Sequence, residues 1–125
     1  MSKYWILDRE DTPQGFPLRK LVAEIRELAR DGDGRFLIRR SQGYGAQVCQ
    51  WDDRLDQADE ISVTADELER LSSGTEEWFY NLDARCVTPT VTIDFGLHDS
   101  SALFLDAPPD LAKQVTAKFK EVRAG

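Results

Sequence analysis

One stretch, residues 77–106, constrains the fold more than any other part of the chain. It contains three runs rich in aromatic and β-branched residues, separated by short polar turns, at 77–86, 91–95 and 102–105. This pattern predicts an antiparallel β-meander in the middle of a sheet. Within the second run, Val91, Ile93 and Phe95 alternate with polar residues. One face of this sheet should therefore be buried and the other exposed to water.

Two other stretches have the three- and four-residue apolar periodicity of amphipathic helices. The first follows Pro17, whose fixed φ suits the first turn of a helix, and ends at a turn signal over residues 31–34. Its apolar residues are Leu18, Leu21, Val22, Ile25, Leu28 and Ala29. The second follows Pro108 and Pro109, and its apolar residues are Leu111, Ala112, Val115, Phe119 and Val122. Both helices are expected to pack these stripes onto the sheet.

The remaining elements are shorter. Strands are expected at 3–8, 35–40 and 46–51, the last two joined as a hairpin by the glycine-containing segment 41–45. Either face of 46–51 could be the buried one. Residues 60–63 are a short strand or an extended approach to a short helix over about 65–71, which begins with the capping-box pair Thr64 and Glu67.

Together these elements predict an α+β fold in a single domain over residues 1–125. It should consist of a mainly antiparallel sheet with two amphipathic helices packed on it and one short extra helix. A chain of 125 residues can bury such a core without disulfides or metal ions. Cys49 and Cys86 fall in predicted strands, so we expect free thiols.

Composition limits the classes of function. The net charge of −7 argues against direct binding of nucleic acid. No apolar run is long enough to span a bilayer, and residues 1–8 lack the pattern of a secretory signal, so we expect no membrane partner and a cytoplasmic location. Metal-ligand spacing of cysteine or histidine is absent, and we expect no cofactor and no metal.

The negative charge is concentrated in residues 52–83, which hold eleven acidic and two basic residues, a local balance of −9. Such a run is often only a solvated face, but crowded like charges also destabilise a fold unless a partner uses them. Aromatic residues border the acids, and this combination suits a surface that fills a basic cleft. The predicted partner-binding residues are Trp51, Asp52, Asp53, Asp56, Asp59, Glu60, Asp66, Glu76, Glu77, Trp78 and Tyr80.

Catalytic readings are weaker. His98 lies in His-Asp-Ser-Ser, but adjacent residues of a tight turn do not converge as a triad, and a turn with backbone hydrogen bonds is the simpler reading. A small enzyme pairing Cys49 or Cys86 with His98 is a further alternative. Residues 31–34 begin like a calcium loop, but arginine and phenylalanine follow where an oxygen ligand and a glycine are required.

The octapeptide Gly34-Arg-Phe-Leu-Ile-Arg-Arg-Ser41 follows an amphipathic helix and resembles the Gly-x-Phe-Leu-Val-Arg-x-Ser motif of SH2 domains. The resemblance covers these eight residues and implies a peptide-recognition module in which Arg39 grips a phosphate and Ser41 is an auxiliary donor. The alternative is an ordinary strand with its arginines on the wet face.

A second resemblance covers most of the chain. A compact acidic α+β domain with no catalytic motif, a strand-turn-strand at 92–105 and a final amphipathic helix is similar to the immunity proteins encoded beside bacterial polymorphic and contact-dependent toxins. This resemblance implies a cytosolic inhibitor rather than an enzyme. Its partner would be a cognate toxin domain, basic and of the nuclease kind, blocked at its active site or at an exosite.

Overall fold

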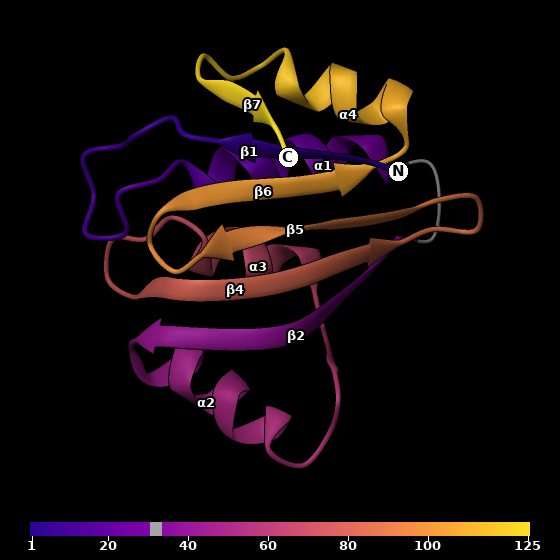
Figure 1. Ribbon diagram of the computed structural model, residues 1–125. Coiled ribbons are helices and arrows are strands. Elements are labelled where there is room, and N and C mark those ends of the chain that lie inside the picture. The colour runs from indigo at the N-terminus through magenta and orange to yellow at the C-terminus, as the bar shows by residue number, and fades with distance from the viewer. Residues whose placement is uncertain (31–33) are drawn as a thin grey trace.

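The computed structural model describes residues 1–30 and 34–125 and has an α+β architecture (Figure 1). Its seven strands form one sheet in the order β3-β2-β4-β5-β6-β1-β7, with every neighbouring pair antiparallel. The elements are β1 (Ser2–Ile6), α1 (Leu18–Leu28), β2 (Arg35–Tyr44), α2 (Ala46–Leu55), β3 (Ile61–Val63), α3 (Ala65–Leu71), β4 (Trp78–Val87), β5 (Thr92–His98), β6 (Ala102–Ala107), α4 (Pro109–Thr116) and β7 (Val122–Ala124). The predicted fold class is confirmed.

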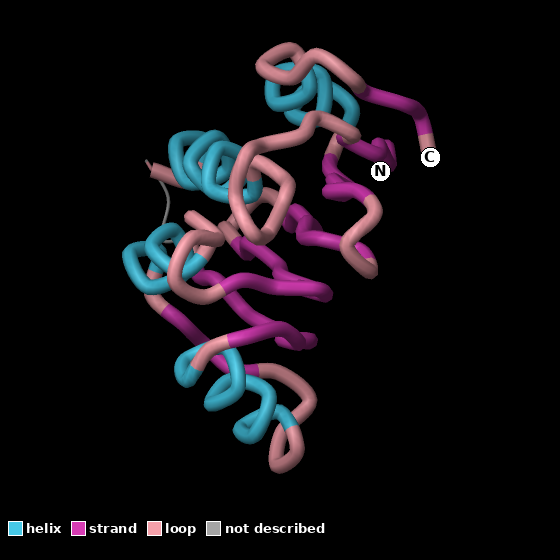
Figure 2. The backbone as a smooth tube through the Cα atoms, turned by 90° about the vertical axis from the view of Figure 1, so that its left-hand side faces the viewer, coloured by secondary structure: helices cyan, strands magenta, loops and turns pink. Residues whose placement is uncertain are grey.

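The helices are distributed unequally around the sheet. Figure 2, which views the sheet nearly edge-on, shows α1, α3 and α4 on one side, while the opposite face carries no helix of the described chain. The fourth helix, α2, lies at the end of the sheet formed by β3 and β2 and contacts both strands. This arrangement leaves an open sheet face, which in Figure 1 points toward the viewer.

The core lies between the sheet and α1, α3 and α4, and α2 adds Val48 and Trp51 to it. In β5, Ile93 and Phe95 are buried whereas Thr92 and Asp94 are partly exposed, which confirms the alternation expected from the sequence. Each fully buried apolar side chain of this kind contributes about 1.5–3 kcal/mol. The largest buried side chains of the core are Trp51, Phe16, Phe79, Phe95, Ile6, Leu18, Leu21, Ile25, Ile38, Leu68, Leu82 and Ile93.

Elements specified by local signals are where the sequence predicts them. The β-meander is β4-β5-β6, and α1 begins directly after Pro17. The α3 capping box is formed: Thr64 Oγ1 accepts from the Glu67 backbone N–H at 3.0 Å, and Glu67 Oε1 accepts from the Thr64 N–H at 3.1 Å. The hydrogen bond from the Thr64 backbone N–H to the Glu67 carboxylate, and next the interaction with the Thr64 side chain, lower the pKa of Glu67.

The predicted strand at 46–51 is wrong, since these residues begin α2. Gly45 has a φ of 122°, a value that favours glycine, and turns the chain out of β2. The carboxylate of Glu77 then accepts hydrogen bonds from the backbone N–H groups of Gln47 and Val48 at 2.8 and 3.0 Å. The predicted hairpin does not form, and β2 pairs instead with β3 and β4.

The last helix is shorter than predicted. It ends at Thr116, and Val122 belongs to β7, which pairs with β1. The carboxylate of Asp8 accepts hydrogen bonds from the backbone N–H groups of Lys120 and Glu121, which directs the chain into this edge strand. Of the predicted turn at 31–34, residues 31–33 lie outside the described residues.

Candidate functional site

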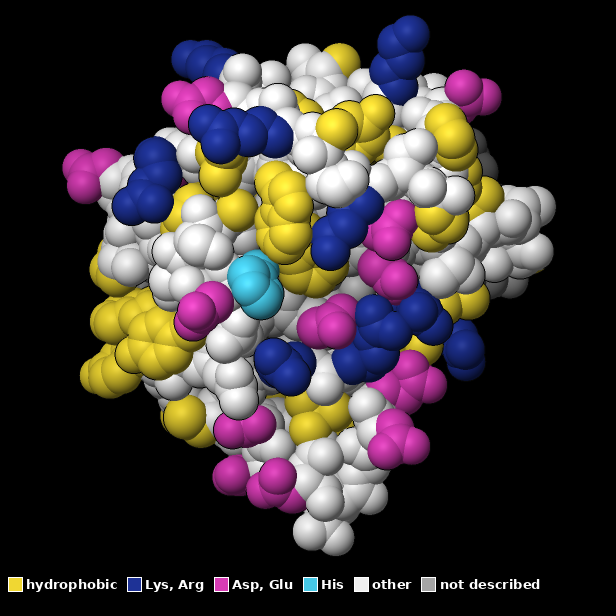
Figure 3. Space-filling model, viewed as in Figure 1, with side chains coloured by type: hydrophobic (Ala, Val, Ile, Leu, Met, Phe, Trp, Pro, Cys, Tyr) yellow, Lys and Arg dark blue, Asp and Glu magenta, His cyan; other side chains and the backbone are white. Residues whose placement is uncertain are grey.

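A pair of aromatic rings, one exposed and one partly exposed, lies where β2 ends and β4 begins. Tyr44 and Trp78 are cross-strand partners, and their rings stack with centroids 4.5 Å apart and planes inclined by 20°. Tyr44 is 55% exposed, and Tyr80, farther along β4, is 47% exposed. Figure 3 shows a hydrophobic patch at the left edge of the molecule, where these strand ends lie. Clustered exposed aromatic side chains are typical of protein-binding surfaces.

The turn between β5 and β6 brings an acidic residue to this patch. Asp99 and Ser100 have φ values of 47° and 51°, the positive values of a tight hairpin turn. The Ser100 N–H donates to the Tyr80 carbonyl oxygen at 2.9 Å, and the Asp99 N–H donates to Asn81 Oδ1 at 2.7 Å. Both bonds fasten the turn to β4 next to Tyr80.

Helix α2 supplies acids on the other side of the patch. Asp52, Asp53 and Asp56 are exposed on this helix. Asp52 and Asp99 line the same hollow of about 460 Å³, together with Tyr80. Carboxylates from α2 and from the β5–β6 turn therefore flank an aromatic side chain of β4. We call Tyr44, Asp52, Asp53, Trp78, Tyr80 and Asp99 the acid-aromatic surface.

The structure separates the predicted binding residues into groups. It brings Asp52 and Tyr80 to one hollow, whereas Trp78 stacks on Tyr44. Asp53 and Asp56 are exposed on α2. Asp59, Glu60 and Glu76 are exposed outside the acid-aromatic surface. Asp66 lies on α3 and forms an ion pair with Arg26 at 2.7 Å, while Glu77 caps α2.

Trp51 was predicted as a surface anchor, and that prediction is wrong. It is fully buried and packs against Phe79, with ring centroids 6.2 Å apart. Its position follows from the helical stripe of Val48, Trp51 and Leu55, which turns toward the sheet. Sequence reasoning also missed Tyr44 and Asp99. Two glycines beside Tyr44 are a weak signal of an exposed turn, but the approach of Asp99 to Tyr80 has no local signal.

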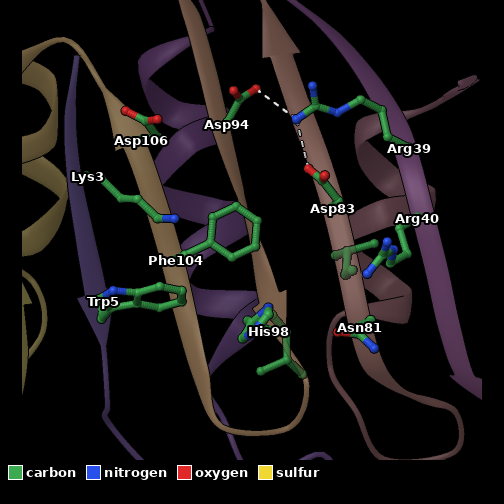
Figure 4. Close-up of a pocket in the computed structure, with 12 residues that line it drawn as sticks. Lys3, Trp5, Arg39, Arg40, Asn81, Asp83, Asp94, His98, Phe104 and Asp106 are labelled. Carbon is green, nitrogen blue, oxygen red and sulfur yellow. Dashed lines mark hydrogen bonds and ion pairs between the residues drawn. The ribbon is translucent and has the colours of Figure 1, made fainter. Parts of the chain in front are cut away.

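The open sheet face holds a second group of polar side chains (Figure 4). Arg39 Nη2 donates to Asp83 Oδ1 at 2.9 Å and lies 3.4 Å from Asp94 Oδ1. Arg85 donates to both carboxylate oxygens of Asp94, at 2.7 and 3.3 Å, and this contact raises the pKa of Arg85. The two carboxylates and two guanidinium groups thus form one ion-pair network across β2, β4 and β5.

This network bears on the SH2-like hypothesis. Arg39 already has two carboxylates as partners, which would have to be displaced by a phosphate. Ser41, the proposed auxiliary donor, is buried and donates to the Val48 carbonyl oxygen at 3.0 Å. Because it is directed at α2 rather than at the network, the predicted cooperation of Arg39 and Ser41 is wrong.

Cys86 and His98 are likewise apart. Cys86 is in the core, where burial raises the pKa of its thiol to about 11. His98 is exposed at the end of β5, beside Trp5, with ring centroids 5.7 Å apart (Figure 4). A dyad of Cys86 and His98 is therefore not formed, and Cys49 is exposed on α2. Both thiols are free, as the sequence predicts.

Within residues 1–30 and 34–125, no group of three or more histidine, cysteine or acidic side chains is arranged to hold a metal ion. No helix of this described part has both the length and the apolar character needed to cross a membrane. Comparison of the chain with protein-family models, with curated proteins and with solved structures found no match.

Proposed function

We propose that this protein is an immunity-type inhibitor that binds a cognate toxin domain through the acid-aromatic surface. The observation that carries this proposal is the stacked pair of exposed Tyr44 and partly exposed Trp78, on the same two strands as the hollow that exposed Tyr80 and Asp52 line. Burying such rings in a partner is favourable, and aromatic anchors of this kind commonly cost 2 kcal/mol or more of binding free energy when truncated, by the usual order of magnitude.

The acids define the chemistry of the partner. Asp52, Asp53 and Asp99 lie in a chain whose net charge is −7, so a basic protein would be attracted to this surface over several ångströms. Electrostatic attraction of this kind raises the association rate, whereas the aromatic rings slow dissociation. A nuclease active site, which is basic because it binds phosphates, has the required complementary charge.

The experiment begins with the gene adjacent to the one encoding this chain. The encoded protein is expressed in a sensitive host with and without this chain, and the affinity of the purified pair is measured at low and high salt. We expect neutralised toxicity and a salt-sensitive complex. Toxicity that persists despite comparable expression, with no complex at low salt, would contradict the proposal.

Variants of the surface separate its two contributions. Trp78→Ala should increase the dissociation rate, and the double variant Asp52→Lys, Asp53→Lys should slow association. The matched control, Glu10→Lys with Glu121→Lys, makes the same charge change at exposed positions outside the surface. If control and α2 variant associate equally slowly, only the net charge matters and the proposed surface is wrong.

A further inference from the structure

The open sheet face has a depression of about 520 Å³ around Gly96 of β5. Gly96 is opposite Asp83 on β4 and Phe104 on β6, and both of these residues line the depression. A Cβ atom at Gly96 would collide with the carbonyl oxygen of Leu82, so the close approach of the two strands requires glycine. We call this depression the Gly96 hollow.

The two walls of the Gly96 hollow differ chemically (Figure 4). One wall is aromatic: Trp5 and Phe104 lie edge to face with centroids 6.3 Å apart. The other wall holds Arg39 and Arg40 together, because the register of β2 shifts between Ile38 and Arg40. Such a bulge redirects side chains, and here it places consecutive arginines beside one hollow.

Of the two arginines on this wall, Arg40 is the one that can pair with a bound group. Arg39 is held by Asp83 and Asp94. Arg40 is exposed and has no ion-pair partner among the residues that the structure describes. On the opposite wall, the Lys3 ammonium lies 4.6 Å from the centroid of the Trp5 ring.

The charge balance indicates the kind of occupant. Three cations and three carboxylates line the hollow: Lys3, Arg39, Arg40, Asp83, Asp94 and Asp106. This balance is unfavourable for a polyanion such as nucleic acid, which needs a net positive surface. An aromatic wall facing a guanidinium group instead suits a planar ring, which can contact Phe104 and receive a cation–π interaction from Arg40.

We propose that the Gly96 hollow receives an aromatic side chain of the protein partner, with an adjacent acidic residue pairing with Arg40. The inference rests on the proposed function in one respect, that the partner is a protein. It adds a second contact, in which a cation, Arg40, meets the partner in place of the carboxylates of the acid-aromatic surface. Asn81 lines both hollows, so the two contacts adjoin.

The test uses small probes and needs no partner. The isotope-labelled protein is titrated with the blocked dipeptides acetyl-Trp-Glu-amide and acetyl-Trp-Lys-amide while amide and indole resonances are recorded. We expect saturable shifts at the Gly96 N–H and the Trp5 indole N–H, with a dissociation constant on the order of 1 mM, as for ligands of this size. The glutamate probe should bind about threefold more tightly, by the usual strength of an exposed ion pair.

Arg40→Glu should reverse the preference between the two probes. The matched control is Arg35→Glu, the same charge change at an exposed position of the same strand, and it should keep the preference of the unmodified protein. Phe104→Ala should weaken the binding of both probes. Absence of saturable shifts at Gly96 and Trp5, or a preference that Arg40→Glu leaves unchanged, would overturn the inference.

The two proposals fail separately. If the probes bind at the Gly96 hollow but the protein neutralises no toxin, the result would support the proposed binding site in the hollow and contradict the proposed inhibitor function. If the protein neutralises the toxin but binds neither probe at the Gly96 hollow, the result would support the proposed inhibitor function and contradict the proposed binding site in the hollow.

Discussion

Glu77 caps a helix that begins 31 residues earlier, at Ala46, since its carboxylate accepts a hydrogen bond from the Val48 backbone N–H at 3.0 Å. Glu77→Ala should therefore lower the free energy of unfolding by about 1–2 kcal/mol, as the loss of a helix cap usually does. Urea denaturation measures this change. Glu76→Ala is the matched control, because Glu76 is exposed, and it should change stability by less than about 0.5 kcal/mol. Equal effects of the two substitutions would show that the cap contributes nothing.

The same contact explains where sequence reasoning succeeded and failed. Helix α3 could be predicted because its cap, Thr64 with Glu67, lies within the helix's own first turn. Helix α2 takes its cap from Glu77, beyond β3 and α3, so the local pattern at 46–51 was mistaken for a strand. The spacing of Val48, Trp51 and Leu55 was the available helical signal.

Prediction of the candidate site from the sequence was limited in the same way, to residues that a local pattern reveals. Trp78 and Tyr80 could be predicted, because aromatic residues beside an acidic run are visible in the sequence. Tyr44 joins them only through the pairing of β2 with β4, and Asp99 only through the turn that bonds to β4. Both depend on strand register, which residue types within a single segment do not determine.

Truncation of Trp51 should mainly lower the stability of the fold, whereas truncation of Trp78 should mainly weaken partner binding. Trp51 is fully buried, so Trp51→Ala should cost about 3–5 kcal/mol of unfolding free energy. Trp78 is partly exposed, so Trp78→Ala should cost about 1 kcal/mol or less while weakening partner binding. Thermal and urea denaturation of both variants check this. A Trp51→Ala protein that keeps its stability but no longer binds the partner would show that Trp51 is a binding residue after all.

Substitution of Trp51 by phenylalanine should destabilise the fold less than substitution by alanine. The Trp51 indole N–H has no hydrogen-bond partner within the described part of the chain, so its removal loses no bond. We expect a loss of about 1–1.5 kcal/mol from reduced packing alone. A loss as large as that of Trp51→Ala, measured in the same urea titration, would mean that the indole N–H is bonded.

Arg39 should matter for stability more than Arg40. Arg39→Ala leaves Asp83 without its partner at 2.9 Å and removes a cation beside Asp94, so we expect a loss of about 1 kcal/mol. Arg40→Ala removes no ion pair of the described residues and should be nearly neutral. The comparison is made by urea denaturation at low and high salt. An Arg39→Ala protein of unchanged stability that no longer retains a phosphotyrosine peptide bound by the wild type would favour the SH2-like reading.

Cys86 should make the fold sensitive to alkali. Burial raises its pKa from 9.0 to about 11, so the folded protein keeps a proton that the unfolded chain releases. Its contribution to stability is present below about pH 9 and is lost as the pH rises through about 11, an effect of roughly 2 kcal/mol. Unfolding free energies of the wild type and of Cys86→Ala, compared across this range, should converge. Curves that stay parallel would contradict the raised pKa.

Cys49 and Cys86 should differ in reactivity. Cys49 is exposed and should react rapidly with a thiol reagent at about pH 8, whereas buried Cys86 should react only after unfolding. One rapid equivalent in native buffer and two in denaturant are expected. Two rapid equivalents in native buffer would show that the β4 core opens readily.

We expect the acid-aromatic surface to bind a basic protein partner. The most direct test of this binding is the association rate of that partner with three proteins: the wild type, Asp52→Lys with Asp53→Lys, and the control Glu10→Lys with Glu121→Lys. At low salt we expect the α2 variant to associate about tenfold more slowly than the control, with the difference shrinking as salt screens the charges. Equal rates for the two variants at every salt concentration would contradict the claim.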